Sequence, residues 1–310
     1  MDPIAHNAEL MRKADLALTD LAAGGLLNVA QAKNFFQQVI EEATFLKYAR
    51  VKPMKSYTDN IDKINITGRV LKNVGAGTAL AVADRTIPTL AQVQVVAKPY
   101  KAEIRLNDDI LEDNIEQKRL SATVQNRMAA AISRDLEELS FEGDTTSADL
   151  FLKSQNGLLK LVTSNTVDAG SNAITFTDFE DAMSAMPHKH KKDRAKMRWI
   201  TGHKVEERFR TDVGTRATTL GDRALFEYIP LTPMGPMILP CAMFPEDITA
   251  TLTACVLMDP KNFILGMWRD IKFEYGRDVS AGETIFVYTV RAGIQLEEED
   301  ASVEIYNVLA

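Results

Sequence analysis

The stretch that decides the fold covers residues 120–144 and has the sequence LSATVQNRMAAAISRDLEELSFEGD. Its apolar residues recur every three or four positions, which places them on one stripe of an α-helix. The members of this stripe are Leu120, Val124, Met128, Ala131, Ile132, Leu136 and Leu139. The charged residues Arg127, Arg134, Glu137 and Glu138 lie off the stripe. We interpret the pair Glu137-Glu138 as surface charge.

Both ends of this helix are marked in the sequence. Upstream, the four acidic residues Asp108, Asp109, Glu112 and Asp113 crowd the start, where the helix dipole favours negative charge. Downstream, Gly143 ends the pattern, as glycine does at helix C-termini. We therefore predict a helix over residues 108–142, roughly 40 to 50 Å long at 1.5 Å per residue. A helix of this length indicates a scaffold rod.

The segment before the rod, residues 50–106, is typical of strands. Apolar and polar residues alternate over residues 64–70 and again over 93–106, with a change of phase near Pro99 that fits a bulge or an edge. Gly75-Ala76-Gly77 marks a turn between the two runs. The simplest structure is a long two-stranded hairpin with an extended tip. Because an isolated ribbon is marginal in water, we predict that it packs on a neighbouring subunit.

Weaker patterns flank these elements. Residues 1–23 and 29–47 predict two helices separated by Gly24-Gly25, either a terminal arm or an ordinary helix pair. Residues 155–270 indicate a compact mixed domain, with helices at 178–186 and 205–209, strands at 197–200, 253–258 and 263–268, and proline-rich buried turns at 229–245. The C-terminal part predicts strands at 271–275, 286–296 and 303–305, with the acidic run 297–300 before the last one. The fold class is therefore α+β.

Composition sets limits on function. The chain has 310 residues, of which 45% are hydrophobic and 25% charged, as in soluble globular proteins. No signal peptide follows Met1, and no apolar run approaches the roughly 18 residues of a membrane span, so we expect cytoplasmic assembly and no membrane partner. The net charge of -7 disfavours a dedicated nucleic-acid binder. Cys241 and Cys255 are interpreted as buried small hydrophobes, with a disulfide as the less favoured alternative.

The chemistry-bearing residues do not form a recognisable active site. The basic run from Lys189 to Arg198 could contact DNA phosphates or acidic neighbours, or it could be a solvated loop between a helix and a strand. His188 and His190 lack the spacing of metal ligands. The sequence contains no nucleophile elbow, Walker loop or dinucleotide fingerprint. We therefore predict no catalytic, cofactor-binding or metal-binding residue, and no cofactor.

Several short motifs occur in a specific order along nearly the whole chain. They are Gly24-Gly25-Leu26-Leu27, KYARVKPM at 47–54, GTAL at 77–80, ADR at 83–85, LEDNIE at 111–116, DLEEL at 135–139, EGDT at 142–145, NGLLK at 156–160, LGDRAL at 220–225 and TVRAGIQL at 289–296. In this order and spacing the chain resembles the major capsid proteins of tailed bacteriophages with the Hong Kong 97 fold. No single motif is diagnostic, and the resemblance rests on the set.

The resemblance implies a domain layout. Residues 1–50 correspond to an N-terminal arm, and residues 51–106 to the extended β-hairpin loop with its flanking strands. Residues 107–154 correspond to the peripheral domain with its spine helix, and residues 155–280 to the axial domain. Residues 281–310 correspond to return strands of the peripheral domain.

The resemblance also implies partners and a location. The chain would assemble with itself into pentamers and hexamers of a virion capsid, beside a portal protein and around double-stranded DNA held by non-specific contact. Only about 50 residues precede the hairpin, which favours a separate scaffolding protein over a fused one. Two alternatives remain: an encapsulin-like nanocompartment shell, and a cytoplasmic enzyme with an unfamiliar site, which predicts a pocket with strongly shifted ionisable groups.

Overall fold

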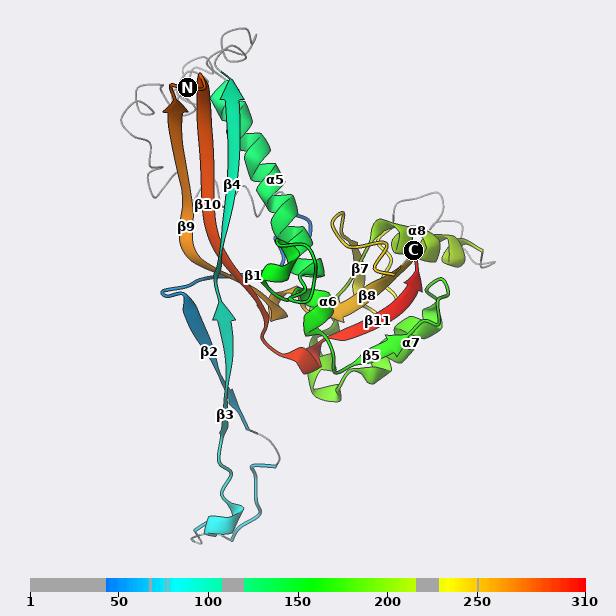
Figure 1. The fold of residues 1–310 in the computed structure, drawn as a ribbon. Coiled ribbons are helices and arrows are strands. Elements are labelled where there is room, and N and C mark those ends of the chain that lie inside the picture. The colour runs from blue at the N-terminus through cyan, green and yellow to red at the C-terminus, as the bar shows by residue number, and fades with distance from the viewer. Residues whose placement is uncertain are drawn as a thin grey trace, which may run out of the picture.

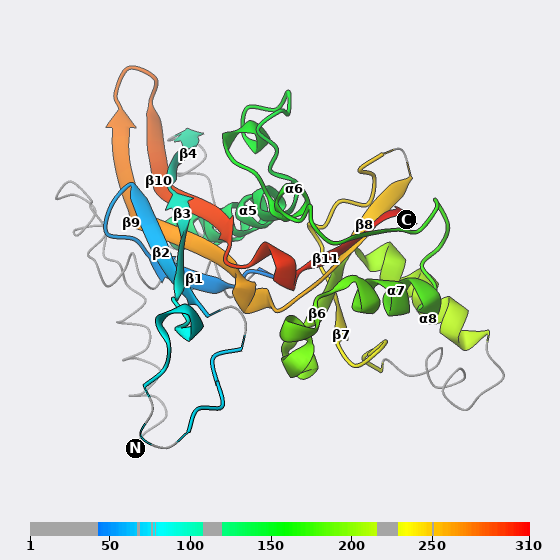
Figure 2. The ribbon, with the colours of Figure 1, turned by 90° about the horizontal axis from the view of Figure 1, so that it is seen from below.

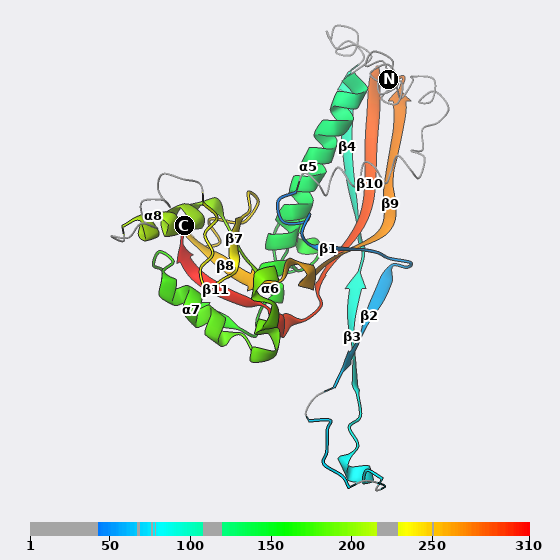
Figure 3. The same ribbon diagram turned by 180° about the vertical axis from the view of Figure 1, so that it is seen from behind.

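The computed structural model describes residues 43–66, 69–75, 77, 79–107, 120–215, 229–249 and 251–310. These residues form two lobes and a ribbon (Figure 1). The elongated lobe combines one long helix with a four-stranded sheet. The compact lobe, with five strands and two helices, lies beside its lower half. The ribbon, residues 58–96, projects away from both lobes, as the view from behind also shows (Figure 3).

The sheet of the elongated lobe has the strand order β1-β9-β10-β4. Its members are β1 (Arg50–Pro53), β9 (Phe263–Asp278), β10 (Glu283–Leu296) and β4 (Lys98–Asn107). β1 is parallel to β9, and the other pairs are antiparallel. Helix α5 (Leu120–Glu142) runs along this sheet, and its residues Met128, Ile132 and Leu136 are buried. The short helices η3 (Leu152–Ser154) and α6 (Leu158–Leu161) follow α5.

The sheet of the compact lobe has the order β5-β11-β8-β6-β7. Its strands are β5 (Thr166–Asp168), β11 (Val303–Leu309), β8 (Leu252–Met258), β6 (Arg198–Thr201) and β7 (Met237–Pro240). Helices α7 (Phe176–Ala185) and α8 (His203–Gly214) lie on one side of this sheet, and α5 and α6 lie on the other (Figure 2). The 3-10 helices η4 (His188–Lys196), η5 (Pro260–Asn262) and η6 (Glu299–Ala301) lie in its connections.

Both faces of the inner strands β6 and β8 are buried, so these two strands have almost no polar face. Along β8, Ala254 and Val256 point to the core shared with α5, whereas Cys255 and Leu257 point to the core under α7 and α8. The first core is continuous with that of the elongated lobe, because it also contains Phe263 and other residues of β9 and β10. The two lobes are therefore joined through a common hydrophobic core as well as through connecting segments.

The ribbon pairs β2 (Thr58–Asn65) with β3 (Thr89–Val96) in antiparallel register, from Thr58 opposite Val96 to Asn65 opposite Thr89. The described part of its tip contains one 3-10 turn, η1 (Val82–Asp84). After Ala97 the chain leaves the ribbon and enters β4, which pairs with β10. The predicted phase change near Pro99 is thus the place where the chain changes its pairing partner.

The predicted rod is confirmed over α5, and its predicted start at 108–119 lies outside the described residues. The predicted helices at 178–186 and 205–209 are confirmed as α7 and the longer α8. Thr175 begins α7 with a capping box, in which its backbone N–H and hydroxyl both donate to Asp178. The strands predicted at 197–200, 253–258, 286–296 and 303–305 are β6, β8, β10 and β11, within a few residues.

Other predictions differ from the structure. The first hairpin strand ends at Asn65, so the alternation continued at Ile66 and Val70 is not a strand. Residues 43–49 form turns where the end of a helix was predicted, and the two predicted helices otherwise lie outside the described residues. The separate strands at 263–268 and 271–275 are one strand, β9, and the turns predicted at 229–245 include β7.

Sheet membership also departs from the predicted layout at the C-terminal end. β9 was placed with the axial residues 155–280, but it pairs with β1 and β10 in the elongated lobe. β11 was placed with the peripheral return strands 281–310, but it pairs with β8 and β5 in the compact lobe. Periodicity identifies a strand but not its partner: β11 is separated in sequence from both of its neighbours, and β9 is separated from β1.

Candidate functional site

The ribbon is held at its root by a small buried cluster. Met54, Ile61, Val95, Ala97 and Ile264 form this cluster, which joins β1, both ribbon strands and β9. Strands β9 and β10 of the elongated lobe each have a glycine beside this cluster. A Cβ atom on Gly266 would lie 2.6 Å from the Met54 Sδ atom, and one on Gly293 would lie 2.6 Å from the carbonyl oxygen of Val96. The ribbon therefore crosses the sheet in backbone-level contact.

Polar and aromatic contacts reinforce the root. The ring of Tyr57 meets the edge of Trp268 at 5.9 Å, and the guanidinium of Arg291 lies 4.3 Å from the centre of the Trp268 ring. An ion pair joins Lys52 of β1 to Asp59 of β2 at 2.9 Å. These contacts attach the start of the ribbon to β1 and β9.

Beyond the root, no other element among the described residues covers the ribbon. Leu90 and Ile64, near the far end of the paired strands, are 74% and 70% exposed. In the tip, Leu71, Ile87 and Val82 are 86%, 83% and 75% exposed. An ion pair between Lys72 and Asp84 (3.3 Å) gives the tip some local order. So many large apolar side chains on a thin projection are typical of a protein–protein contact surface.

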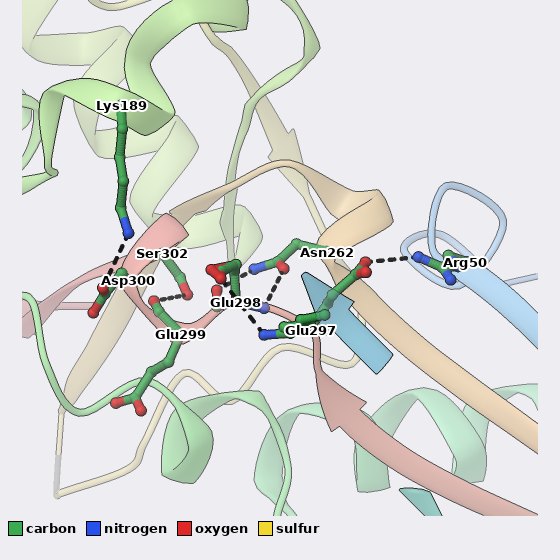
Figure 4. Close-up of polar contacts among 9 residues, drawn as sticks. Arg50, Lys189, Asn262, Glu297, Glu298, Glu299, Asp300 and Ser302 are labelled. Carbon is green, nitrogen blue, oxygen red and sulfur yellow. Dashed lines mark hydrogen bonds and ion pairs between the residues drawn. The ribbon is translucent and has the colours of Figure 1, made fainter. Parts of the chain in front are cut away.

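A cluster of ion pairs and hydrogen bonds lies where the lobes and the ribbon meet (Figure 4). The acidic crossover, residues 297–300, connects β10 of the elongated lobe to β11 of the compact lobe. Glu297 pairs with Arg50 of β1 at 2.6 Å, and Glu298 pairs with Lys63 of the ribbon at 3.7 Å. Asp300 pairs with Lys189 of η4 at 3.5 Å. Adjacent acidic residues thus contact different parts of the molecule.

The remaining contacts of the crossover are hydrogen bonds. Glu299 accepts from the Thr163 hydroxyl, from the Ser164 hydroxyl (2.9 Å) and from the backbone N–H of Thr163 (3.0 Å), and these donors lower the pKa of Glu299. The side-chain amide of Asn262, in the other connection between the lobes, donates to the Glu298 carbonyl (2.7 Å) and accepts from its backbone N–H (2.8 Å). The two connections are therefore bound to each other.

The basic run has one member in this site. Lys189 reaches the crossover, whereas Lys196 pairs with Asp193 (3.0 Å) and Lys191 donates to the Ser184 carbonyl (3.3 Å). The run is an exposed 3-10 helix between α7 and β6, and its acidic neighbour is within the same chain. Burial and the nearby Lys189 lower the pKa of His190, which lines an open pocket of about 470 Å³ between the lobes.

Glu137 was predicted as surface charge, and that prediction is wrong. Its side chain is buried, with the residue 3% exposed, and it accepts hydrogen bonds from the backbone N–H groups of Thr44 (3.2 Å) and Phe45. Phe45 packs between Phe141 and Phe263, each with ring centres 5.1 Å away. Burial raises the pKa of Glu137. The carboxylate therefore anchors residues 44–45 on α5, a role that a charged residue at a helical position does not reveal by its spacing.

The residues considered for catalysis or metal binding do not come together. Within the described ranges, no three His, Cys, Asp or Glu side chains are grouped as metal ligands. Cys241 and Cys255 are both buried, as predicted, but they lie in different cores. A further cavity of about 150 Å³ between α5, β4 and β10 is lined mainly by apolar residues, and burial raises the pKa of Asp135 at its edge. None of the helices in the described part of the chain has the length and apolar character needed to cross a bilayer.

The amino-acid sequence matches a known protein family and a known relative. Residues 23–305 match the model of the family described as "Phage capsid family". The chain is 32% identical to the "Putative prophage capsid protein YqbE" of Bacillus subtilis (strain 168) over 308 residues, which are 98% of this chain and 99% of that protein.

Solved structures show the same arrangement of elements. The capsid of the native GTA particle has a TM-score of 0.64 at 15% identity, covering 87% of this chain and 91% of that one. A chain of the satellite phage P4 procapsid that includes the size determination (Sid) protein has a TM-score of 0.65 at 11% identity, covering 96% and 97%.

Proposed function

The chain belongs to the phage capsid family, and from this premise we propose that copies of it build a closed shell by laying the ribbon of one subunit on the next. The protein is a structural subunit of the virion capsid and not an enzyme. Its fold is the α+β Hong Kong 97 type. Neither the nanocompartment nor the enzyme alternative receives support from these matches.

The exposed ribbon carries this proposal. Its strands lack a covering layer, and its tip exposes Leu71, Val82 and Ile87 to solvent. Fully burying such a side chain contributes roughly 1.5 to 3 kcal/mol. A subunit interface needs on the order of 1,000 Å² or more of buried surface, and a ribbon of this length supplies an extended contact of that kind.

The finer assignments follow from the same family. The elongated lobe is proposed as the peripheral domain, and the compact lobe as the axial domain around the five-fold and six-fold axes of pentamers and hexamers. A separate scaffolding protein, a portal protein and packaged double-stranded DNA are proposed as further partners, with assembly in the host cytoplasm. The net charge of -7 fits a shell that holds DNA without binding it tightly.

Deleting the tip tests the proposal. Removing residues 76–90 is a simple version, but it also removes the start of β3. Because Asn65 pairs with Thr89, residues 66–88 can be replaced by a two-residue Asn-Gly turn that closes the ribbon without disturbing its register. We expect this tip-less variant to fold with an unchanged unfolding transition and to form no closed particles in electron micrographs. Normal shells from the tip-less variant would overturn the proposal.

A further inference from the structure

We propose that the acidic crossover, residues 297–300, is a charge latch that sets the angle at which the ribbon and the two lobes meet in the free subunit. This inference goes beyond the proposed function, because it concerns one subunit before any contact with another. It would explain how a ribbon attached through a small root is already aimed when a neighbour arrives.

The latch is built from consecutive residues that point to separate segments. Glu297 holds β1 through Arg50, and Asp300 holds the compact lobe through Lys189 (Figure 4). Between them, Glu298 holds the ribbon through Lys63. The backbone beneath them is fixed, because Asn262 brackets Glu298 with two hydrogen bonds and the carbonyl of Asn262 accepts from the N–H of Glu297 at 2.9 Å. The charges are therefore displayed from a firm base toward parts that can move.

The ion pairs of the crossover are weak enough to open and close in solution. The two carboxylates of the Glu297 and Asp300 pairs are 31% and 55% exposed, and their basic partners are exposed to a similar degree. Exposed ion pairs are individually weak and are screened by salt. The pair of Lys63 with Glu298 is more enclosed, since the Lys63 side chain is 18% exposed. Together the three pairs on one short segment favour one geometry, and each can be released without exposing a hydrophobic core.

Space for movement lies next to the latch. The open pocket of about 470 Å³ is lined by Lys189, His190 and Lys192 from the compact lobe and by Glu297 and Glu298 of the crossover. Here the lobes face each other through polar side chains, in contrast to the close packing of their common core. Side chains around the crossover can therefore rearrange without disturbing the common core.

The consequence is that ionic conditions set how well the ribbon is oriented. With the latch closed, less orientational freedom is lost when the ribbon docks on its partner, and association is favoured. With the latch screened or neutralised, the ribbon samples a wider range of directions about its root.

Spin-label distances in the full chain test this directly. Labels at Leu90→Cys on the ribbon and Asp181→Cys on α7 report the angle, and the native Cys241 and Cys255 are buried and so protected from labelling. Dilution with excess unlabelled protein suppresses distances between subunits. We expect a narrow distribution at low salt, a broad one at about 1 M salt, where the Debye length falls to about 3 Å, and a broad one at both salts for the triple variant Glu297→Gln, Glu298→Gln, Asp300→Asn.

Charge reversal and a matched control complete the test. Glu298→Lys should broaden the distribution, and adding Lys63→Glu should restore it, because the pair is then rebuilt with opposite polarity. Lys204→Gln removes the ion pair between Lys204 of α8 and Glu246, neither of which lines the pocket beside the crossover, and it should change nothing. A triple variant as narrow as the wild type, or one that still broadens with salt as the wild type does, would overturn the latch. Failure to form shells would bear on the proposed function alone, since the distances are measured within one chain.

Discussion

The sheet of the compact lobe and the β2–β3 ribbon are both made of β-strands, but they bury their side chains in opposite degrees. In β8 every residue from Thr253 to Met258 is buried, because helices or other strands cover both faces. In the ribbon, burial is confined to the root, where Ile61 and Val95 contact β1 and β9. Further along, Ile64 and Leu90 face solvent.

The difference separates the energy of folding from the energy of assembly. Apolar burial in the lobes is realised within one chain and stabilises the subunit. The exposed apolar side chains of the ribbon contribute no such free energy within one subunit. They contribute it only when another molecule covers them. A subunit built in this way can fold first and associate later, and mutations in the two regions should affect different measurements.

The largest effect should come from the tip. The triple variant Leu71→Ser, Val82→Ser, Ile87→Ser removes three exposed apolar side chains of the tip, each contributing roughly 1.5 to 3 kcal/mol if buried in a partner. We expect the protein concentration needed for shell formation to rise on the order of a thousandfold or more, since each 1.4 kcal/mol is a factor of ten. The free energy of unfolding of the subunit should change by less than about 0.5 kcal/mol per site. Light scattering against concentration and urea unfolding measure the two quantities.

Two controls sharpen this comparison. Leu150→Ser changes a residue that is 87% exposed but lies outside the ribbon, and it should leave assembly near the wild-type level. Leu257→Ala, inside the sheet of the compact lobe, should instead cost roughly 2 to 5 kcal/mol of subunit stability. If Leu150→Ser blocks shells as strongly as the tip variant, exposure anywhere matters and the ribbon has no special role.

The same two regions differ in what the sequence could predict. The rod was predictable because burial on one side imposes a helical period on residues such as Leu136, and β8 was predictable because burial on both faces gives a short apolar run around Val256. The ribbon was predicted as a hairpin, but its first strand was extended to Val70, since apolar residues in an uncovered tip alternate without pairing. In a subunit that completes its surface with other copies, exposed apolar residues imitate a core pattern.

Contacts between distant segments could not be predicted at all. The acidic run 297–300 and the basic run 189–198 were both visible, but nothing in their spacing joins Asp300 to Lys189. Glu137 has the helical position of a surface residue, and its burial depends on the turn at residues 44–45, which are 92 or more positions away. Likewise, nothing in the sequence of β11 indicates that it pairs with β8, which lies upstream of both β9 and β10.

A smaller effect, on folding alone, is expected in the compact lobe at Glu304 of β11. Burial raises the pKa of this carboxyl from 4.5 to about 7, so the folded chain holds the proton more tightly than the unfolded chain. The free energy of unfolding should therefore fall as pH rises from about 4.5 to about 7, by on the order of 3 kcal/mol at 1.4 kcal/mol per unit. Glu304→Gln should remove this fall and leave the variant more stable than the parent above pH 7.

The measurement is urea unfolding of the tip-less subunit against pH, so that assembly does not contribute. Wild-type and Glu304→Gln profiles that run parallel between pH 4.5 and 7 would contradict the expected burial of this carboxyl. If instead the variant removes the slope while shells of the full-length protein form at an unchanged concentration, the separation of folding from assembly holds for the compact lobe.

The smallest effect should arise at the ribbon root, where the two regions meet and the separation ends. Gly266 and Gly293 are opposite each other in the sheet, and both lie against the side chain of Val95. A methyl group on Gly293 would meet the backbone carbonyl of Val96, which cannot move without the ribbon, whereas one on Gly266 would meet Val95 and the flexible end of Met54. We expect Gly293→Ala to cost roughly 1 to 3 kcal/mol in urea unfolding and also to raise the concentration needed for shells, with Gly266→Ala milder in both. Equal effects at the two positions would mean that the whole root shifts to accommodate either methyl group. The backbone contact at Gly293 would then have no special part in orienting the ribbon.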